Sequence, residues 1–200
     1  MILSRNRPMS DIIPEQPTLD PLFIALGERC AETHEHCGRV GRLAWMLGSA
    51  CGLPANELGL LAAAARFHDI GKIGIPDAVL HKPGRLDAEE RELMMTHSER
   101  GERIFAAVRC GDAGVVATAI RHHHEWFDGA GYPDGLHGEQ IPLLSRIVNL
   151  ADSYDAMAST RPYQRPRTHG DIMRIMREER GRKSDPRLFD LFEQLTQQQA

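Results

Sequence analysis

Two hundred residues, 42% hydrophobic and 26% charged, suffice for one domain with a core and exclude a wholly disordered chain. The lack of a long apolar stretch and of a signal-peptide pattern excludes a membrane span and predicts a cytoplasmic protein. The chain has 24 basic and 28 acidic residues and a net charge of −4, so no DNA binding is expected. The unusual feature of the composition is its ten histidines.

The chain opens with a proline-containing stretch and then becomes helical in pattern. Residues 1–18 carry prolines among scattered polar residues, which predicts a flexible leader or the stub of a linker before a domain over residues 19–197. Apolar residues at intervals of three and four over residues 40–47 indicate a helix with one face toward the core. Residues 58–67 are apolar on nearly every side, so this helix is expected at the centre of the core.

Glycine and proline mark the loops between the later helices. A loop over residues 71–85 is followed by Asp87 and Glu90, the spacing of a capping box, which predicts a helix to about Val108. A glycine-rich loop covers residues 128–138. Four further helices are expected, over residues 115–125, 142–158, 170–179 and 186–195. No sustained strand pattern occurs, so the class is all-α, a compact bundle of about seven or eight helices.

The strongest local signal is a histidine beside an aspartate at the end of the apolar helix. His68 and Asp69 are followed three residues later by Lys72. A neutral imidazole and a carboxylate are ligands for divalent metals of intermediate hardness, and the carboxylate can bridge two ions. A buried, charged Asp69 is costly without a compensating cation. Lys72 is near enough in the chain to neutralise a phosphoryl group at the same site.

Further histidines and a glutamate stand where they can join this pair. Glu32 and His36 are four residues apart on an expected helix and therefore share one face. His97 is a single imidazole in the helix that begins at Asp87. Residues 122–124 are three consecutive histidines, and because helical neighbours point about 100° apart, at most two of them can serve one site.

Two aspartates inside an apolar helix complete the candidate set. Asp is a poor residue for a helix interior, so Asp152 is expected to be a ligand. Asp155, one turn later, could instead hold a ligand histidine by its other ring nitrogen. The candidate metal ligands are Glu32, His36, His68, Asp69, His97, His123, His124 and Asp152. Five imidazoles and three carboxylates suit two or three ions that share a bridging hydroxide, and the natural reaction is hydrolysis of a phosphoester.

Several long motifs stand in order along the chain. They are HDIGKIGIPD at residues 68–77, LHKPG at 80–84, HHEWFDGAGYP at 123–133, and then IP at 141–142, RI at 146–147 and RPY at 161–163. In order and spacing these motifs resemble the HD-GYP domain, a branch of the HD metal-dependent phosphohydrolases, over roughly residues 20–195. The resemblance implies an HD-type helical bundle and hydrolysis of cyclic di-GMP.

The resemblance also implies roles for the candidate ligands. All eight match metal ligands of the family, and Glu32 matches an extra carboxylate of members that hold three ions, often iron. Three ions are therefore expected in preference to two. Lys72 matches a lysine that meets the scissile phosphate, so Asp69 and Lys72 are the expected catalytic residues.

Substrate contacts are implied in the same way. Lys72, Tyr132 and Arg161 resemble residues that hold the dinucleotide. Members often have a basic residue directly after the Arg-Pro-Tyr run, where this chain has Gln164, with Arg165 next. Arg165 is the expected substitute, and without it the affinity for cyclic di-GMP falls.

The expected function is metal-dependent hydrolysis of cyclic di-GMP to pGpG, and in a second round to GMP, by a metal-bridging hydroxide. Two or three divalent ions are the expected cofactors, with iron or manganese favoured among the metals that these ligand types admit. A regulatory protein partner is possible, and the oligomeric state is open. Two alternatives remain: a hydrolase of another cyclic dinucleotide or nucleotide phosphoester, and a non-catalytic module that senses the dinucleotide.

Overall fold

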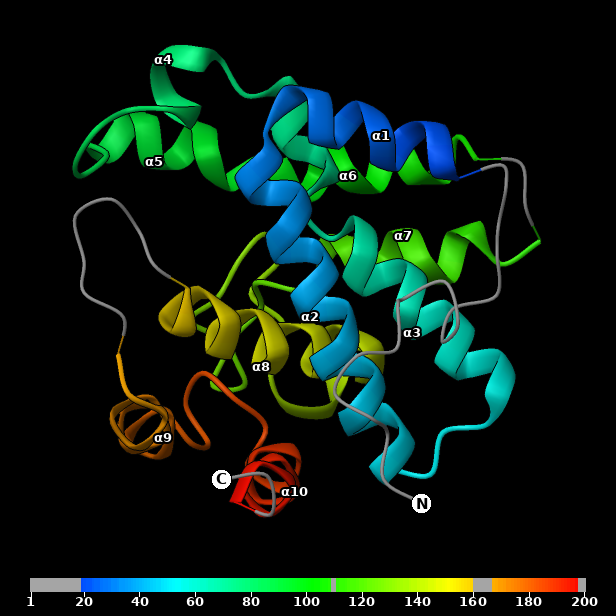
Figure 1. Cartoon of the computed structure of the whole chain (residues 1–200), viewed down its shortest axis with the longest axis vertical. Coiled ribbons are helices and arrows are strands. Elements are labelled where there is room, and N and C mark those ends of the chain that lie inside the picture. The colour runs from blue at the N-terminus through cyan, green and yellow to red at the C-terminus, as the bar shows by residue number, and fades with distance from the viewer. Residues whose placement is uncertain (1–18, 109–110, 160–166, 198–200) are drawn as a thin grey trace.

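The computed structural model describes residues 19–108, 111–159 and 167–197, which form a bundle of helices without a β-strand (Figure 1). In chain order the helices are α1 (Asp20–Arg29), α2 (Ala31–Ala50), α3 (Ala55–Phe67), η2 (Ile70–Gly74, 3-10), α4 (Asp77–Leu80), α5 (Ala88–Met95), α6 (His97–Ala106), α7 (Ala113–Arg121), η3 (Gly138–Gln140, 3-10), α8 (Leu143–Ala158), α9 (His169–Glu178) and α10 (Pro186–Gln197). The all-α prediction is confirmed, while the predicted leader lies outside the described residues.

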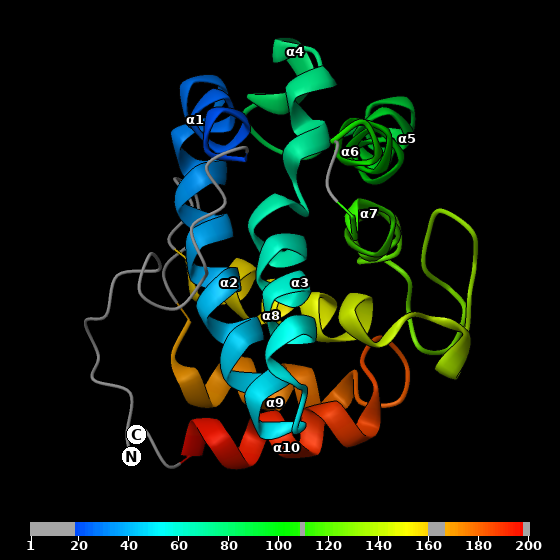
Figure 2. The same cartoon turned by 90° about the vertical axis from the view of Figure 1, so that its right-hand side faces the viewer.

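Helices α2 and α3 run side by side through the middle of the molecule, and α8 packs against both (Figures 1 and 2). Helices α9 and α10 lie across one end of this group, and α1 and α4 lie at the other. The pair α6 and α7 covers a further side of α3, with η2 packed on α6. Among the described residues, no helix has both the length and the apolar composition needed to cross a bilayer.

Helix α3 is the centre of the core, as its sequence predicted. Leu61 and Phe67 are fully buried, and so are the alanines at 62, 64 and 65, whose small side chains let neighbouring helices approach on several sides. The Phe67 ring packs on Phe105 of α6 with 5.4 Å between ring centroids. The end of α3, directly before His68 and Asp69, is therefore surrounded by packed helices.

The prediction of one helix from Asp87 to about Val108 is wrong in one respect, because the helix is broken at Thr96. The predicted capping box at its start is present. At the break, the Thr96 hydroxyl donates to the carbonyl oxygen of Leu93 at 2.7 Å, and the backbone N–H of Thr96 also donates to that oxygen. This tight turn ends α5 and makes His97 the first residue of α6.

The helix predicted over residues 115–125 ends four residues earlier, at Arg121. Side chains donate hydrogen bonds to the backbone carbonyl oxygens at the end of this helix: Ser145 Oγ donates to Ala119 at 3.3 Å and His123 Nδ1 donates to Ile120 at 2.6 Å. The three consecutive histidines therefore lie in a turn after α7, and the helical spacing assumed for them does not apply.

Candidate metal centre

Most of the candidate ligands converge on Asp69, directly after α3. One histidine comes from α2, one precedes Asp69, one opens α6 and two lie in the turn after α7, while an aspartate comes from α8. In chain order they are His36, His68, Asp69, His97, His123, His124 and Asp152, and they are called the metal centre below. Two groups within it each bring three ligand atoms within 4.8 Å of one another: His97, His123 and His124, and His36, His68 and Asp69.

The sequence after α3 brings Asp69 against α6. Residues 70–74 form η2, whose backbone packs on α6. A Cβ atom on Gly71 would lie 1.9 Å from the carbonyl oxygen of His97, so glycine alone permits this approach. The approach sets His97 Nε2 at 3.4 Å from Asp69 Oδ1.

Three of the histidines orient their rings with the same backbone contact. In each, Nδ1 donates to the carbonyl oxygen three residues earlier: His68 to Ala65 at 2.8 Å, His97 to Met94 at 2.8 Å and His123 to Ile120 at 2.6 Å. Because a carbonyl can only accept, the proton is assigned to Nδ1, and Nε2 carries a lone pair. Each ring therefore presents an unprotonated nitrogen to the centre.

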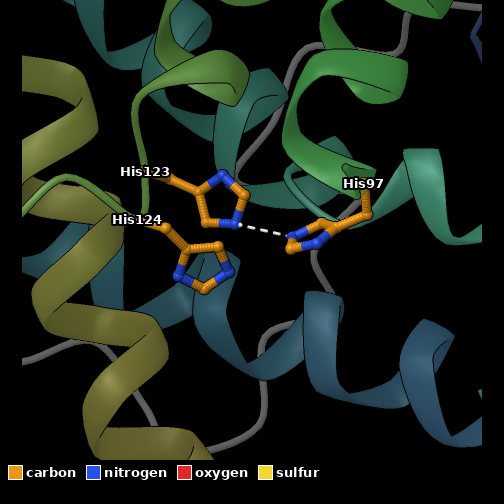
Figure 3. Close-up of side chains that lie close together, drawn as sticks. All are labelled: His97, His123 and His124. Carbon is orange, nitrogen blue, oxygen red and sulfur yellow. Dashed lines mark hydrogen bonds between the residues drawn. The ribbon is translucent and has the colours of Figure 1, made fainter. Parts of the chain in front are cut away.

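These lone pairs face one another without a proton between them. The Nε2 atoms of His97 and His123 are 3.3 Å apart, with His124 beside them (Figure 3). The Nε2 atom of His68 is buried and has no hydrogen-bond partner. Facing acceptors repel, and a buried unpaired acceptor is costly, unless a cation lies among them. Imidazole nitrogens and carboxylate oxygens are transition-metal ligands, so these residues fit a divalent ion.

His36 is held differently, by carboxylates from α8. Its Nδ1 donates to Asp155 Oδ2 at 2.7 Å, and its Nε2 lies 3.0 Å from Asp152 Oδ1 and 4.0 Å from Asp69 Oδ2. Asp155 therefore holds a histidine of the centre, the role considered for it as an alternative to a ligand. Asp155 is itself bound by Arg39, which sequence reasoning gave no role although it follows His36 by three residues on the same helix.

The electrostatics favour metal-binding protonation states in most of the centre. Burial lowers the pKa of His123 to about 3, so its ring is neutral at physiological pH. Burial opposes ionisation of Asp69, but Lys72 and the nearby imidazoles hold its pKa well below the usual range. Burial also opposes the charged form of His36, yet hydrogen bonds to Asp152 and Asp155 raise its pKa to about 9. In the metal-free centre His36 therefore carries a proton that a metal ion would displace.

A cavity of about 260 Å³ opens beside the centre. Its walls include Glu32, His36, Arg39, Lys72, His124 and Asp152. Lys72 Nζ donates to Asp69 Oδ2 at 2.6 Å and lines this cavity. Glu32 is exposed at the wall, one helical turn before His36, and lies outside the two groups of three ligands. The arrangement can accept an anionic group beside Lys72 and the centre.

The Gly-Tyr-Pro loop lies against the histidines of the turn. The Tyr132 ring is tilted by 31° to the His124 ring, with 4.8 Å between centroids, and the Tyr132 backbone N–H donates to the His124 carbonyl oxygen at 3.2 Å. A Cβ atom on Gly131 would lie 2.2 Å from the backbone nitrogen of Trp126, so this loop requires glycine. The predicted substrate contacts Arg161 and Arg165 lie outside the described residues.

His122 faces away from the metal centre into a second cluster. Its Nδ1 lies 3.6 Å from Glu125 Oε1 and 3.5 Å from Asp134 Oδ2. We call His122, Glu125 and Asp134 the loop cluster, because Glu125 also accepts the Asp134 backbone N–H at 2.7 Å. Arg121 donates to both carboxylate oxygens of Asp134 at 2.8 Å each. This cluster has its own cation and anchors the loop after Pro133.

Comparison with known proteins identifies the relatives of this chain. A family model described as the HD domain matches residues 20–188. The cyclic di-GMP phosphodiesterase response regulator RpfG of Xanthomonas campestris is 39% identical over 176 residues, 88% of this chain and 47% of that protein. The 3′3′-cGAMP-specific phosphodiesterase 2 of Vibrio cholerae is 37% identical over 167 residues, 84% of this chain and 32% of that protein. The chain thus spans less than half the length of these relatives.

Solved structures share the fold. A cyclic GMP-AMP-specific phosphodiesterase of V. cholerae (V-cGAP3) superposes with a TM-score of 0.63 at 24% identity, over 82% of this chain and 44% of that chain. The HD domain of the Listeria monocytogenes phosphodiesterase PgpH superposes with a TM-score of 0.62 at 17% identity, over 90% of this chain and 99% of that chain. The expected HD-type bundle is confirmed.

Proposed function

The chain belongs to the HD domain family, and on that premise we propose that it is a metal-dependent phosphodiesterase that hydrolyses cyclic di-GMP to pGpG and then to GMP. The observation that carries this proposal is the convergence of the unprotonated Nε2 atoms of His68 and His97 on the Asp69 carboxylate, with the Nε2 atom of His123 3.3 Å from that of His97. The names of relatives by sequence, cyclic di-GMP phosphodiesterases among them, support the substrate class.

The residues proposed to hold the metal are those of the metal centre, with Glu32 added at the cavity wall. Divalent ions bound there would supply charge neutralisation at the phosphoryl oxygens and a water made more acidic by coordination. Two ions fit the two groups of three ligands, and the carboxylate of Glu32 at the cavity wall supports a third ion. Iron or manganese is proposed because imidazole and carboxylate ligands admit both.

Lys72 and Asp69 have complementary roles in this proposal. Asp69 is buried and ionised, with one oxygen toward His97 and the other toward His68 and Lys72, so it can bridge two ions. The Lys72 ammonium has further donors beyond the one it gives to Asp69, and its side chain lines the cavity. We propose that these donors bind an equatorial oxygen of the scissile phosphate and stabilise the charge that develops there.

The Tyr132 ring is proposed to hold the dinucleotide above the centre. It is half-buried and lies over His124, which gives a base or ribose an aromatic surface close to the phosphate position. Arg161 and Arg165 are proposed to bind the remaining phosphate, since a cyclic dinucleotide carries two negative charges. The proposed compartment remains the cytoplasm, with a regulatory protein partner.

Replacement of Asp69 tests the proposal most directly. We expect Asp69→Ala to lose bound metal and to reduce cyclic di-GMP turnover to background, while circular dichroism still shows the helical fold. Asp112→Ala is the matched control, because Asp112 is exposed at the start of α7 and its side chain makes no capping hydrogen bond. Retained turnover in metal-analysed Asp69→Ala would contradict the assignment of the site.

A second substrate has specific support. Relatives named 3′3′-cGAMP-specific phosphodiesterases match this chain at 37% and 35% identity, close to the 39% of the cyclic di-GMP relative. Turnover of cyclic di-GMP and of 3′3′-cGAMP by the same metal-loaded protein, compared as kcat/KM, decides between them. Calorimetric binding of either ligand without product after long incubation would instead identify a sensing module.

A further inference from the structure

His36 is the histidine of the centre whose Nδ1 partner is charged and comes from another helix. The rings of His68, His97 and His123 rest on carbonyl groups of their own chain segment, which local backbone structure keeps in place. The His36 ring rests on the Asp155 carboxylate, 119 positions away in the chain. Its orientation therefore depends on whatever holds Asp155.

Arg39 and Ser159 hold that carboxylate. Arg39 Nε donates to Asp155 Oδ1 at 2.8 Å and approaches Oδ2 at 3.1 Å. Ser159 Oγ donates to Asp155 Oδ2 at 3.0 Å and accepts from Arg39 Nη2 at 2.9 Å. Asp155 is only 4% exposed, and both of its oxygens accept hydrogen bonds from these groups or from His36.

We infer that Arg39 is a positioning residue for the metal centre: through Asp155 it holds the His36 ring with Nε2 toward Asp69 and Asp152. The inference rests on the metal centre of the proposed function. Hydrogen bonds from a ligand histidine to a carboxylate fix the ring and make the metal-binding nitrogen a stronger donor. Arg39 keeps the Asp155 carboxylate at hydrogen-bond distance from His36, although the two residues lie on different helices, α8 and α2.

The geometry requires arginine and not merely a positive charge. Two nitrogens of one planar group reach two partners at once, Nε to Asp155 and Nη2 to Ser159. A lysine ammonium is a single point donor on a flexible stem, so it can pair with Asp155 but cannot keep both contacts in the same plane. The Arg39→Lys variant keeps the positive charge but loses the two-partner geometry, so it separates the effect of the charge from that of the geometry.

The matched control is another arginine of α2. Arg42 follows Arg39 by three residues on α2, is exposed, and is not among the residues that line the cavity. Arg42→Ala removes the same charge and a side chain of the same size from the same helix. Its metal affinity should equal that of the wild type.

The experiment is titration of the metal-free full chain with Mn²⁺ in competition with a chelator of known affinity. The variants are Arg39→Ala, Arg39→Lys, Asp155→Asn and the control Arg42→Ala. We expect Arg39→Ala and Asp155→Asn to weaken Mn²⁺ binding about 10–100-fold, the range for loss of a group that supports a metal ligand. Arg39→Lys should fall between Arg39→Ala and the wild type.

Thermal unfolding of the same metal-free proteins separates positioning from packing. If Arg39 only joins α2 to α8, its variants unfold at lower temperature but bind Mn²⁺ as tightly per folded molecule as the wild type, and the inference is overturned. If Arg39→Ala does not fold, the Mn²⁺ affinities per folded molecule of Arg39→Lys and Asp155→Asn test the inference in its place. A wild-type chain that binds no Mn²⁺, Fe²⁺ or Zn²⁺ would refute the proposed function itself, and that outcome is distinct from equal affinities among the variants.

Discussion

The metal centre and the loop cluster are built from the same residue types and adjoin at His122 and His123, yet their charges are balanced differently. In the loop cluster, Arg121 donates to both oxygens of Asp134 and to Glu102, so carboxylates meet a guanidinium of the same chain. In the metal centre, Lys72 pairs with Asp69, but the Nε2 lone pairs of His97 and His123 still face each other at 3.3 Å. The difference lies in the cation: a guanidinium binds the Asp134 carboxylate of the loop cluster, although Glu125 Oε2 is buried there without a hydrogen-bond partner, whereas the facing Nε2 atoms of His97 and His123 have no cationic side chain of the described residues between them.

The largest expected effect contrasts the two adjacent histidines. His123→Ala should lose at least one metal ion and reduce turnover to background, because its Nε2 is part of the centre. His122→Ala should keep the full metal content and lose about 1–3 kcal/mol of stability, since the buried Glu125 carboxylate loses a polar neighbour. Metal analysis and denaturant unfolding of both variants provide the measurement. Equal metal loss in the two would remove the distinction between the clusters.

Metal removal should affect one cluster and not the other. At free metal about 1,000 times its dissociation constant, binding stabilises the folded chain by about 4 kcal/mol. For a chain of this length each kcal/mol shifts the unfolding midpoint by about 2–4 °C. We expect a chelator to lower the midpoint of the wild type and of His122→Ala equally and to lower that of His123→Ala less. If the chelator does not change the unfolding midpoint of the wild type, the facing lone pairs of His97 and His123 are compensated without a metal ion.

The Gly-Tyr-Pro loop joins the two clusters, and a single methyl group should disturb it. In Gly131→Ala the added Cβ meets the Trp126 nitrogen at 2.2 Å and the His124 carbonyl oxygen at 2.5 Å, so the backbone must move. We expect a loss of about 1–3 kcal/mol in stability. KM should rise because Tyr132 shifts, and metal content should fall less than in His123→Ala, because the rings of His68, His97 and His123 rest on carbonyl groups outside this loop.

Gly114→Ala is the control for that experiment. A Cβ atom on Gly114 meets nothing within 4 Å, and the residue lies in α7, where alanine is the better helix former. Its stability should rise slightly with no change in KM. An unchanged KM in Gly131→Ala would exclude Tyr132 from substrate binding.

The parts of the fold and site that could be predicted are those that depend on residues close in the chain. The apolar run of α3, the capping box at Asp87 and the adjacent His68 and Asp69 are of this kind. The break at Thr96 was not predicted, because a side-chain bond to Leu93 competes there with a continuous helical pattern. The partner of Asp155 could not be predicted either, since its contact with His36 depends on how α2 packs on α8.

The smallest expected effect concerns the ion pair that neutralises the loop cluster. Arg121 and Asp134 are partly exposed, with side chains 23% and 37% accessible, so water and salt screen their attraction. A double-mutant cycle with Arg121→Gln and Asp134→Asn should give a coupling of about 0.2–1 kcal/mol, smaller at high salt. Neither substitution should change the metal content, because Arg121 and Asp134 lie outside the metal centre. If Arg121→Gln instead gains a bound Zn²⁺ ion, the released Asp134 joins His122 and Glu125 as a cation site, and the arginine alone separates the two clusters.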